Sequence, residues 1–167
     1  AGADNSLADG FQAQHGLNYP AWFARQHPAA LPHVEFLGGV SEERLNQLYQ
    51  TCDLFVAPSL YESFGLIYLE AMNYGKAVVG CRAGGIPEVV RGVGGALLSD
   101  PGDLVALARA VADLVAQHGS DPEARARIHR SAAAKFSLDA RTEQLEAIYL
   151  EQIRARLEQR PADEDAA

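Results

Sequence analysis

Residues 53–81 read DLFVAPSLYESFGLIYLEAMNYGKAVVGC, two short apolar runs on either side of a segment of helical length. The runs 54–57 and 77–81 are too short for buried helices and are bounded by Asp, Pro and Gly, so both predict strands. Residues 64–74 between them predict a helix closed by Gly75. This order, with a connection of helical length, predicts parallel strands in an α/β sheet.

The same rhythm extends on both sides of this stretch. Apolar runs at 34–37 and 96–98 predict two further strands, and all four strands are expected to be buried on both faces. Residues 42–50 and 87–91 predict helices between them. We therefore expect a doubly wound, Rossmann-like parallel sheet with helices on both faces.

The sequence beyond residue 98 predicts helices in series. Asp100 is expected to cap the first, with Pro101 at its first position. Asp121 begins another in the same way, and Ser137 is expected to cap a long last helix that ends near Gln159. The carboxyl terminus is thus expected to be helical.

The two ends of the chain differ from this regular pattern. Residues 3–33 are polar, aromatic and proline-punctuated, which predicts a long excursion with one short helix at 21–26. Residues 1–5 resemble the exit of a strand whose earlier part is absent. We expect one domain at 1–160 that lacks its first strand–helix unit, and a disordered acidic tail at 161–167.

Charge and composition exclude several classes of protein. The formal net charge is −8 and the pI is near 5.0, which argues against nucleic acid or anionic membranes as partners. The five histidines lack the spacing of metal ligands, and no apolar run reaches about 18 residues. With two cysteines and no signal-peptide character at the start, a soluble, cytoplasmic, metal-free protein is expected.

The turn after residue 57 has the features of an anion site. It follows a predicted strand and opens a predicted helix, so it lies at the carboxyl edge of the sheet, where open α/β sheets bind ligands. The first amides of the helix lack intrahelical partners, and Gly65 has no side chain to block approach to them. Together with the helix dipole, these amides predict a site for a pyrophosphate.

Two glutamates frame this turn, Glu62 before the helix and Glu70 within it. Apolar residues surround Glu70, so its carboxylate is expected to be buried and to need hydrogen-bond donors, which ribose hydroxyls would supply. A rise of about 1.5 Å per residue would separate the two glutamates by roughly 12 Å, which suits the two ends of a nucleoside diphosphate sugar. The alternative is structural: Glu62 favours a helix amino terminus, and Glu70 pairs with an internal Arg or backbone amide.

Residues 58–72 resemble the signature of the retaining GT-B-type, or group 1, glycosyltransferases, in which two glutamates flank seven residues containing Phe-Gly-Leu. The resemblance covers roughly residues 34–98, in order and at the usual spacing. It includes the segments 36–40, 48–53, 75–80 and 84–90.

The resemblance implies an activity and a set of site residues. Such enzymes cleave the bond between the anomeric carbon and the diphosphate with retention, by front-face return or a short-lived covalent intermediate, and require no metal or other cofactor. By position, Glu62 would be the catalytic residue beside the hydroxyls of the transferred sugar, and Glu70 would hold the nucleotide ribose. Backbone groups would complete the donor site at Phe64, Gly65 and Leu66 for the sugar and diphosphate, and at Gly39 and Val40 for the base.

Two parts of the family pattern are absent from the sequence. The family places an Arg and a Lys that grip the diphosphate after the first strand of this domain, and it binds the acceptor on a separate N-terminal domain. We expect a nucleotide sugar as the ligand and that acceptor-binding domain as the missing partner. Weak donor binding and no turnover are expected of this chain alone.

Other functions stay open. A GT-B-like domain that serves as a protein-interaction module without catalysis is the main alternative, and an isomerase or phosphorylase on the same scaffold is a third. The transferase and the interaction module differ at Glu70. A ligand site leaves an open pocket around this residue, whereas an interaction domain seals it with an internal cation. Lys76 and Arg82 are expected to be solvated surface residues. Gly84-Gly85 is expected to open a helix, and its amides either face the donor or serve the fold alone.

Overall fold

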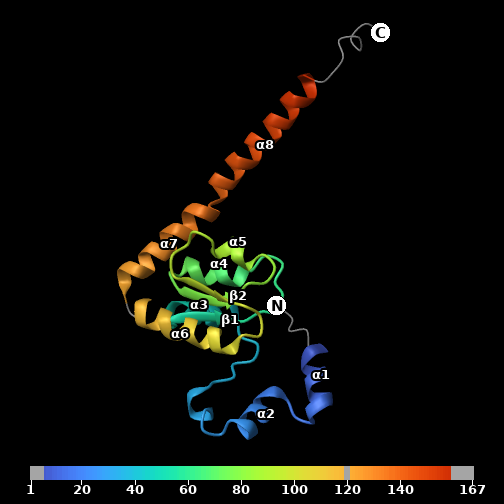
Figure 1. Cartoon of the computed structure of the whole chain (residues 1–167), viewed down its shortest axis with the longest axis vertical. Coiled ribbons are helices and arrows are strands. Elements are labelled where there is room, and N and C mark those ends of the chain that lie inside the picture. Colours follow the sequence, from blue (N-terminus) through green and yellow to red (C-terminus); the bar gives the residue numbers. More distant parts are fainter. Residues whose placement is uncertain (1–5, 119–120, 159–167) are drawn as a thin grey trace. The chain divides into compact units, whose positions relative to one another are not determined.

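Residues 6–118 and 121–158 are described by the computed structural model of the chain (Figure 1). The predictions for residues 1–5, for Gln159 and for the tail at 161–167 lie outside these ranges. The chain divides into two compact units, Ala1–Gln47 and Leu48–Ala167.

The first unit contains two short helices. α1 spans Ser6–His15 and α2 spans Tyr19–Gln26, and a 3-10 turn, η1, follows at Leu31–His33. Asn18 caps α2 by accepting a hydrogen bond from the amide of Ala21 at 3.0 Å. The helix predicted at 21–26 is therefore confirmed, whereas the polar sequence of α1 gave no signal strong enough to predict it.

The strand predicted at 34–37 is wrong. This stretch is irregular, and Val34, Phe36 and Leu37 are 39%, 39% and 37% exposed. A short apolar run becomes a strand only where a neighbouring backbone supplies ladder hydrogen bonds. Within the described ranges no strand pairs with it, and the Phe36 ring instead packs edge-on against Tyr19 and Phe23.

The second unit is built on a parallel sheet of three strands in the order β1-β2-β3, namely Leu54–Ala57, Ala77–Cys81 and Ala96–Ser99. Leu54 pairs with Ala77, and Val78 pairs with Ala96. All of β2 is buried, whereas β1 and β3 are partly exposed because each has a neighbour on one side only. The predicted fold class is confirmed, and full burial of every strand is not.

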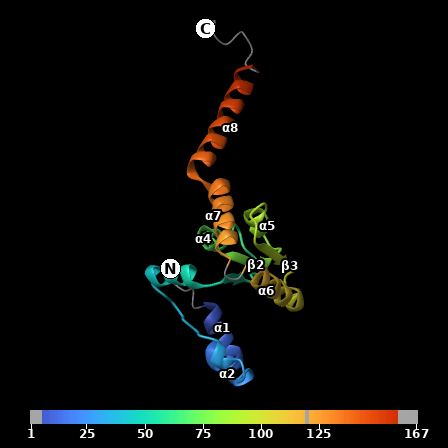
Figure 2. The same ribbon diagram turned by 90° about the vertical axis from the view of Figure 1, so that its left-hand side faces the viewer.

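Helices cover both faces of this sheet. α4 (Leu66–Asn73) and α5 (Ile86–Val90) lie on one face, and α6 (Leu104–His118) lies on the other (Figure 1, Figure 2). α3 (Glu42–Thr51) begins in the first unit and ends in the second, directly before β1. The helices predicted at 42–50, 64–74 and 87–91 are thus confirmed with shifted ends.

The start of α6 differs from the prediction. Residue 102 is a glycine with φ +85°, which ends any helix begun at Pro101. The chain instead forms a turn between Asp100 and Asp103, whose side chain accepts a hydrogen bond from the amide of Ala106 at 2.9 Å. Asp103 is therefore the cap, and the prediction of Asp100 with Pro101 is wrong.

The last two helices begin as predicted. Asp121 accepts a hydrogen bond from the amide of Glu123 at the start of α7 (Pro122–Phe136). Ser137 accepts from the amide of Ala140 at the start of α8 (Leu138–Glu158). α7 buries one face, at Ala124, Ile128 and Ala132, whereas α8 buries no side chain and exposes many apolar ones.

The loops after β1 and β2 are locked together through their backbones. The amide of Gly85 donates a hydrogen bond to the carbonyl oxygen of Glu62 at 2.9 Å. At Gly84, φ is +51°, and an added Cβ would lie 1.8 Å from the same oxygen. The two loops can approach this closely only because residue 84 has no side chain.

We predict that Gly84→Ala destabilises the chain by about 2–4 kcal/mol, because it combines an unfavourable φ with direct overlap on the Glu62 carbonyl. Gly92→Ala is the matched control, since Gly92 also has a positive φ, +76°, but an added Cβ there meets nothing within 4 Å. The control should lose only about 1–2 kcal/mol. Urea unfolding of both variants measures the difference, and equal losses would show that the loop contact contributes no stability.

Candidate functional site

Three predicted site residues, Glu62, Phe64 and Gly65, lie on the turn between β1 and α4, and a fourth, Leu66, is the first residue of α4. Gly65 is the N-cap of α4, with φ +96° in the left-handed region, and it is buried. As a glycine it offers no side-chain acceptor to the first amides of α4. Phe64 and Leu66 on either side are 45% and 61% exposed. An amino terminus of this kind, reached past exposed side chains, suits an anionic group.

Glu70 does not lie where the sequence predicted. It is exposed rather than buried, because α4 buries Tyr68, Ala71 and Met72 and turns its other side outward. The exposed side of α4 cannot be recognised from its sequence, because Leu66 on that side is apolar and yet exposed.

A tyrosine from α3 holds the Glu70 carboxylate. The Tyr49 hydroxyl donates to Glu70 Oε2 at 3.1 Å. Tyr49 is 6% exposed, and its ring stacks on that of Tyr74 at 5.6 Å. Burial, together with this hydrogen bond, raises the pKa of Tyr49 well above its ordinary value. The hydroxyl therefore stays protonated at neutral pH and fixes one carboxylate oxygen.

Glu62 is half-buried at the opposite end of the turn. Its backbone oxygen accepts the hydrogen bond from the Gly85 amide. Of the two orientations that the sequence left open for this amide, the structure shows the one that faces Glu62 and not a ligand. The estimate of roughly 12 Å between the two glutamates assumed a continuous helix. That assumption is wrong, because α4 begins only at Leu66.

A cavity of about 440 Å³ opens beside Glu70, between α4 and α7. Its walls come from both helices and from the residue after α7: Leu66, Leu69, Glu70 and Asn73 on one side, and Ala132, Ala133, Phe136 and Ser137 on the other. Within residues 6–118 and 121–158 no cation pairs with the Glu70 carboxylate. Glu70 thus lies in an open pocket rather than under an internal ion pair.

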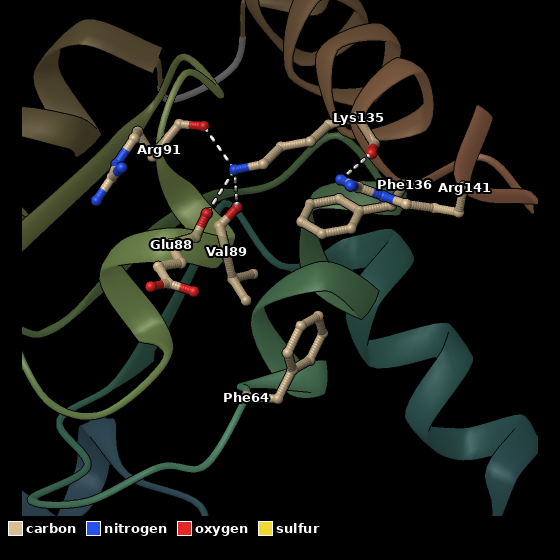
Figure 3. A pocket seen from close by; sticks show the side chains of 7 residues that line it. All are labelled: Phe64, Glu88, Val89, Arg91, Lys135, Phe136 and Arg141. Atoms are coloured by element: carbon tan, nitrogen blue, oxygen red, sulfur yellow. Dashed lines mark hydrogen bonds between the residues drawn. The ribbon is translucent and has the colours of Figure 1, made fainter. Parts of the chain in front are cut away.

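A second cavity, of about 610 Å³, lies beside Phe64 (Figure 3). Phe136 lines both cavities, and its ring meets that of Phe64 at 6.2 Å in an edge-on arrangement. Lys135 Nζ and the Arg141 guanidinium lie 5.1 and 5.3 Å from the Phe136 ring centroid. Arg91 also lines the cavity, although its side chain extends away from the two rings in Figure 3.

Lys135 joins α7 to the end of α5. Its ammonium donates to the carbonyl oxygens of Glu88, of Val89 at 3.1 Å and of Arg91 at 2.7 Å (Figure 3). These three acceptors use all three N–H groups of the ammonium. Burial, followed by the nearby Arg91 and Arg141, lowers the pKa of Lys135.

Lys76 and Arg82 behave differently from each other. Arg82 is exposed, as expected, and pairs with Asp100 at 2.7 Å. The expectation of a solvated Lys76 is wrong: it is 2% exposed, and its Nζ donates to the carbonyl oxygen of Gln50 at 2.9 Å. The side chain can be buried because its charge is placed at the carboxyl end of α3, where the carbonyls carry partial negative charge.

Gly39 and Val40 belong to the first unit. Both lie in the irregular segment before α3, and Val40 is 38% exposed. Their predicted place beside the base therefore stays a prediction.

Sequence reasoning did not identify Tyr49, Lys135, Phe136 or Arg141 as parts of this region. Lys135 and Glu88 are 47 residues apart, and no motif spacing relates them. Tyr49 lay within a recognised segment, but its hydrogen bond to Glu70 depends on how α3 packs beside α4.

Two general features of the described chain bear on its chemistry. Residues 6–118 and 121–158 contain no group of three or more His, Cys, Asp or Glu side chains arranged to hold a metal ion. In the same ranges no helix combines the length and apolarity that a membrane crossing requires.

The chain is similar to known glycosyltransferases. Residues 14–117 match the family described as glycosyl transferases group 1. The D-inositol 3-phosphate glycosyltransferase of Mycolicibacterium vanbaalenii is 42% identical over 107 residues, which cover 62% of this chain and 22% of that protein. The O-antigen chain mannosyltransferase B of Escherichia coli is 45% identical over 74 residues, 44% of this chain and 19% of that one.

A solved structure supports the same relationship. Sucrose-phosphate synthase from Thermosynechococcus elongatus matches with a TM-score of 0.65 and 28% identity, over 81% of this chain and 34% of that chain. The present chain therefore spans about a fifth to a third of the length of these relatives. The resemblance seen in the sequence is confirmed, and the chain belongs to the glycosyl transferases group 1 family, with the Rossmann-like half of a GT-B fold.

Proposed function

We propose that this chain binds the donor of a retaining glycosyltransferase, a nucleoside diphosphate sugar whose sugar passes to an acceptor hydroxyl. The observation that supports this most strongly is Glu70. Its carboxylate is exposed in a cavity of about 440 Å³, held by the neutral Tyr49 hydroxyl, with no cation of the described residues paired to it. A carboxylate kept open in this way accepts hydrogen bonds from vicinal hydroxyls such as those of ribose.

The remaining residues of the turn supply the other parts of the proposal. The diphosphate would meet the amides at the start of α4, around Phe64, Gly65 and Leu66, and Glu62 would act on the transferred sugar. When the bond from the anomeric carbon to the diphosphate breaks, the negative charge passes to the leaving diphosphate. Helix amides can stabilise that charge without a metal ion.

The acceptor would be bound by an N-terminal acceptor-binding domain. The family's relatives are several times longer than this chain, which is consistent with such a division of labour. We therefore expect the chain alone to bind the donor weakly and to turn over no substrate.

One observation favours a second function, a protein-interaction module without catalysis. The α8 helix buries no residue and exposes Leu145, Ile148, Tyr149 and Ile153, each about half or more. Under that alternative a folded chain would bind no nucleoside diphosphate. Ligand binding therefore separates the two functions.

The first prediction from this proposal concerns where the ligand binds. Titration with UDP, GDP and ADP should perturb the amide resonances of Phe64, Gly65 and Leu66, and those of Gly39 and Val40, more than any others. The amides of α8 serve as the internal reference. A folded chain whose largest shifts fall on α8, or that responds to none of the three nucleotides, would contradict the proposal and favour the interaction module.

The second prediction separates the two glutamates. Glu70→Gln should weaken nucleoside diphosphate binding roughly ten- to a hundredfold, the effect of losing about 1.5–3 kcal/mol of hydrogen bonds to a charged acceptor. Glu62→Gln should leave that affinity within about threefold, because Glu62 faces only the sugar, and should lower turnover of a complete enzyme much more. Calorimetric titration measures the affinities.

Glu146→Gln, an exposed carboxylate on α8, is the charge-matched control and should change neither affinity nor melting temperature. The assignment of roles is wrong if Glu62→Gln and Glu70→Gln lose nucleotide affinity equally. It is also wrong if Glu70→Gln binds normally with an unchanged melting temperature.

The third prediction concerns the complete reaction. Joined to the acceptor-binding domain and upstream strand–helix unit of a relative, the chain should transfer sugar with retained anomeric configuration in the presence of a chelator. The configuration of the first product, read by proton NMR coupling constants, tests retention. An inverted product, or activity that appears only with added divalent metal, would contradict the proposed chemistry.

A further inference from the structure

Two lysines of the second unit donate hydrogen bonds to backbone carbonyls near the candidate site, Lys76 to one carbonyl and Lys135 to three. Each places its ammonium at the carboxyl end of a short helix, Lys76 at α3 and Lys135 at α5. Each helix also contacts one of the two glutamates.

At one end, Lys76 fixes α3 beside Glu70. Its Nζ donates to Gln50 O at 2.9 Å, and the adjacent residue, Tyr49, donates to Glu70. Lys76 is 2% exposed, so the donor side of this part-buried bond is shielded from water. A charge-assisted bond from a buried ammonium is stronger than one between exposed groups, and its loss leaves the Gln50 carbonyl without this donor.

At the other end, Lys135 fixes α5 beside Glu62. Its ammonium joins the carbonyls of Glu88, Val89 and Arg91 at the end of α5. At the start of α5, the amide of Gly85 donates to the Glu62 carbonyl at 2.9 Å. α5 has only five residues, so it forms a short connection between Lys135 and the Glu62 turn.

The end of α7 makes a second contact with the Glu62–Phe64 turn. Phe136 follows Lys135 in the chain, and its ring meets that of Phe64 at 6.2 Å (Figure 3). The end of α7 thus contacts both sides of the Glu62–Phe64 turn, once through α5 and once directly. Phe136 also lines the cavity beside Glu70, but among the hydrogen bonds and ion pairs of the described residues none joins Lys135 to Tyr49 or Glu70.

We propose that Lys76 and Lys135 are separate positioning residues, Lys76 for the nucleotide end of the site through Tyr49 and Glu70, and Lys135 for the sugar end through α5 and Glu62. This inference rests on the proposed function for the identity of the two ends. The separation of the two networks is a property of the free chain and is tested without a ligand.

The ligand-free test uses amide hydrogen exchange and chemical shifts of Lys76→Met and Lys135→Met. Lys135→Met should speed exchange of the Gly85 amide by about tenfold or more, because the end of α5 loses its charge-assisted hydrogen bonds to the ammonium. It should shift the Glu62 and Phe64 resonances and leave those of Tyr49 and Glu70 unchanged. Lys76→Met should shift the resonances of Tyr49 and Glu70, and should leave the exchange rate of the Gly85 amide and the resonances of Glu62 and Phe64 unchanged.

The ligand test uses the Kd values of UDP, GDP and ADP and of their hexose conjugates. Lys76→Met should raise the Kd of a nucleotide and of its sugar conjugate by the same factor, about tenfold. Lys135→Met should leave the Kd of the free nucleotide within about threefold and raise that of the conjugate by about tenfold relative to it. A lysine whose role was only to stabilise the fold would not produce this split.

Two further variants control for loss of the fold. Lys135→Arg keeps a cation with several donors, and the cavity of about 610 Å³ beside the ammonium has room for the larger side chain. The exchange rate of the Gly85 amide in this variant should therefore lie within about threefold of the wild-type rate. Arg82→Met removes an exposed cation that also donates to a backbone carbonyl, that of Leu98, and should affect neither end. If a methionine variant does not fold, Lys76→Gln and Lys135→Gln carry the same test with one neutral donor retained.

The outcomes distinguish this inference from the proposed function. If the wild-type chain binds none of the six ligands, the proposed function is wrong, and the exchange data alone decide whether the two networks are separate. If the chain binds them but each lysine variant perturbs both ends equally, the donor site stands and separate positioning is overturned. Opposite, end-specific effects of the two variants support it.

Discussion

The candidate site depends on the close contact between the loops that follow β1 and β2. The Glu62 carbonyl accepts the amide of Gly85, and residue 84 must be glycine because a Cβ there would overlap that oxygen. Backbone atoms form this contact, so it fixes the turn independently of side-chain rotamers. The start of α5 is thereby tied to the turn that opens α4, and the amides of α4 are presented from a rigid scaffold.

The sheet was predictable because its pattern is local. Three short apolar runs alternate with helix-length segments, and parallel pairing follows from the connection lengths alone. The run at 34–37 is equally short and is apolar except at Glu35, but it forms no strand, since pairing also needs a neighbouring backbone that sequence alone does not identify. The start of α6 was misplaced for a local reason instead, because Gly102 adopts a left-handed conformation after Pro101.

The sequence identified several residues of the candidate site but not their exposure or their contacts. Spacing and resemblance singled out Glu62, Gly65 and Glu70, and the structure brings these onto one strand–turn–helix segment. The exposure of Glu70 could not be derived from the apolar residues around it, because an apolar helix exposes one side wherever no neighbour covers it. The contacts of Lys135 were equally out of reach, because they join residues 47 positions apart.

The central claim is that Glu70 and the start of α4 bind the ribose and the diphosphate of one donor. A crystal structure of the chain with a bound nucleoside diphosphate tests this most directly. The account predicts both ribose hydroxyls within hydrogen-bonding distance of Glu70 and diphosphate oxygens on the amides around Gly65 and Leu66, at about 2.7–3.2 Å. A nucleotide bound elsewhere on the chain, with Glu70 still held only by Tyr49, would contradict it.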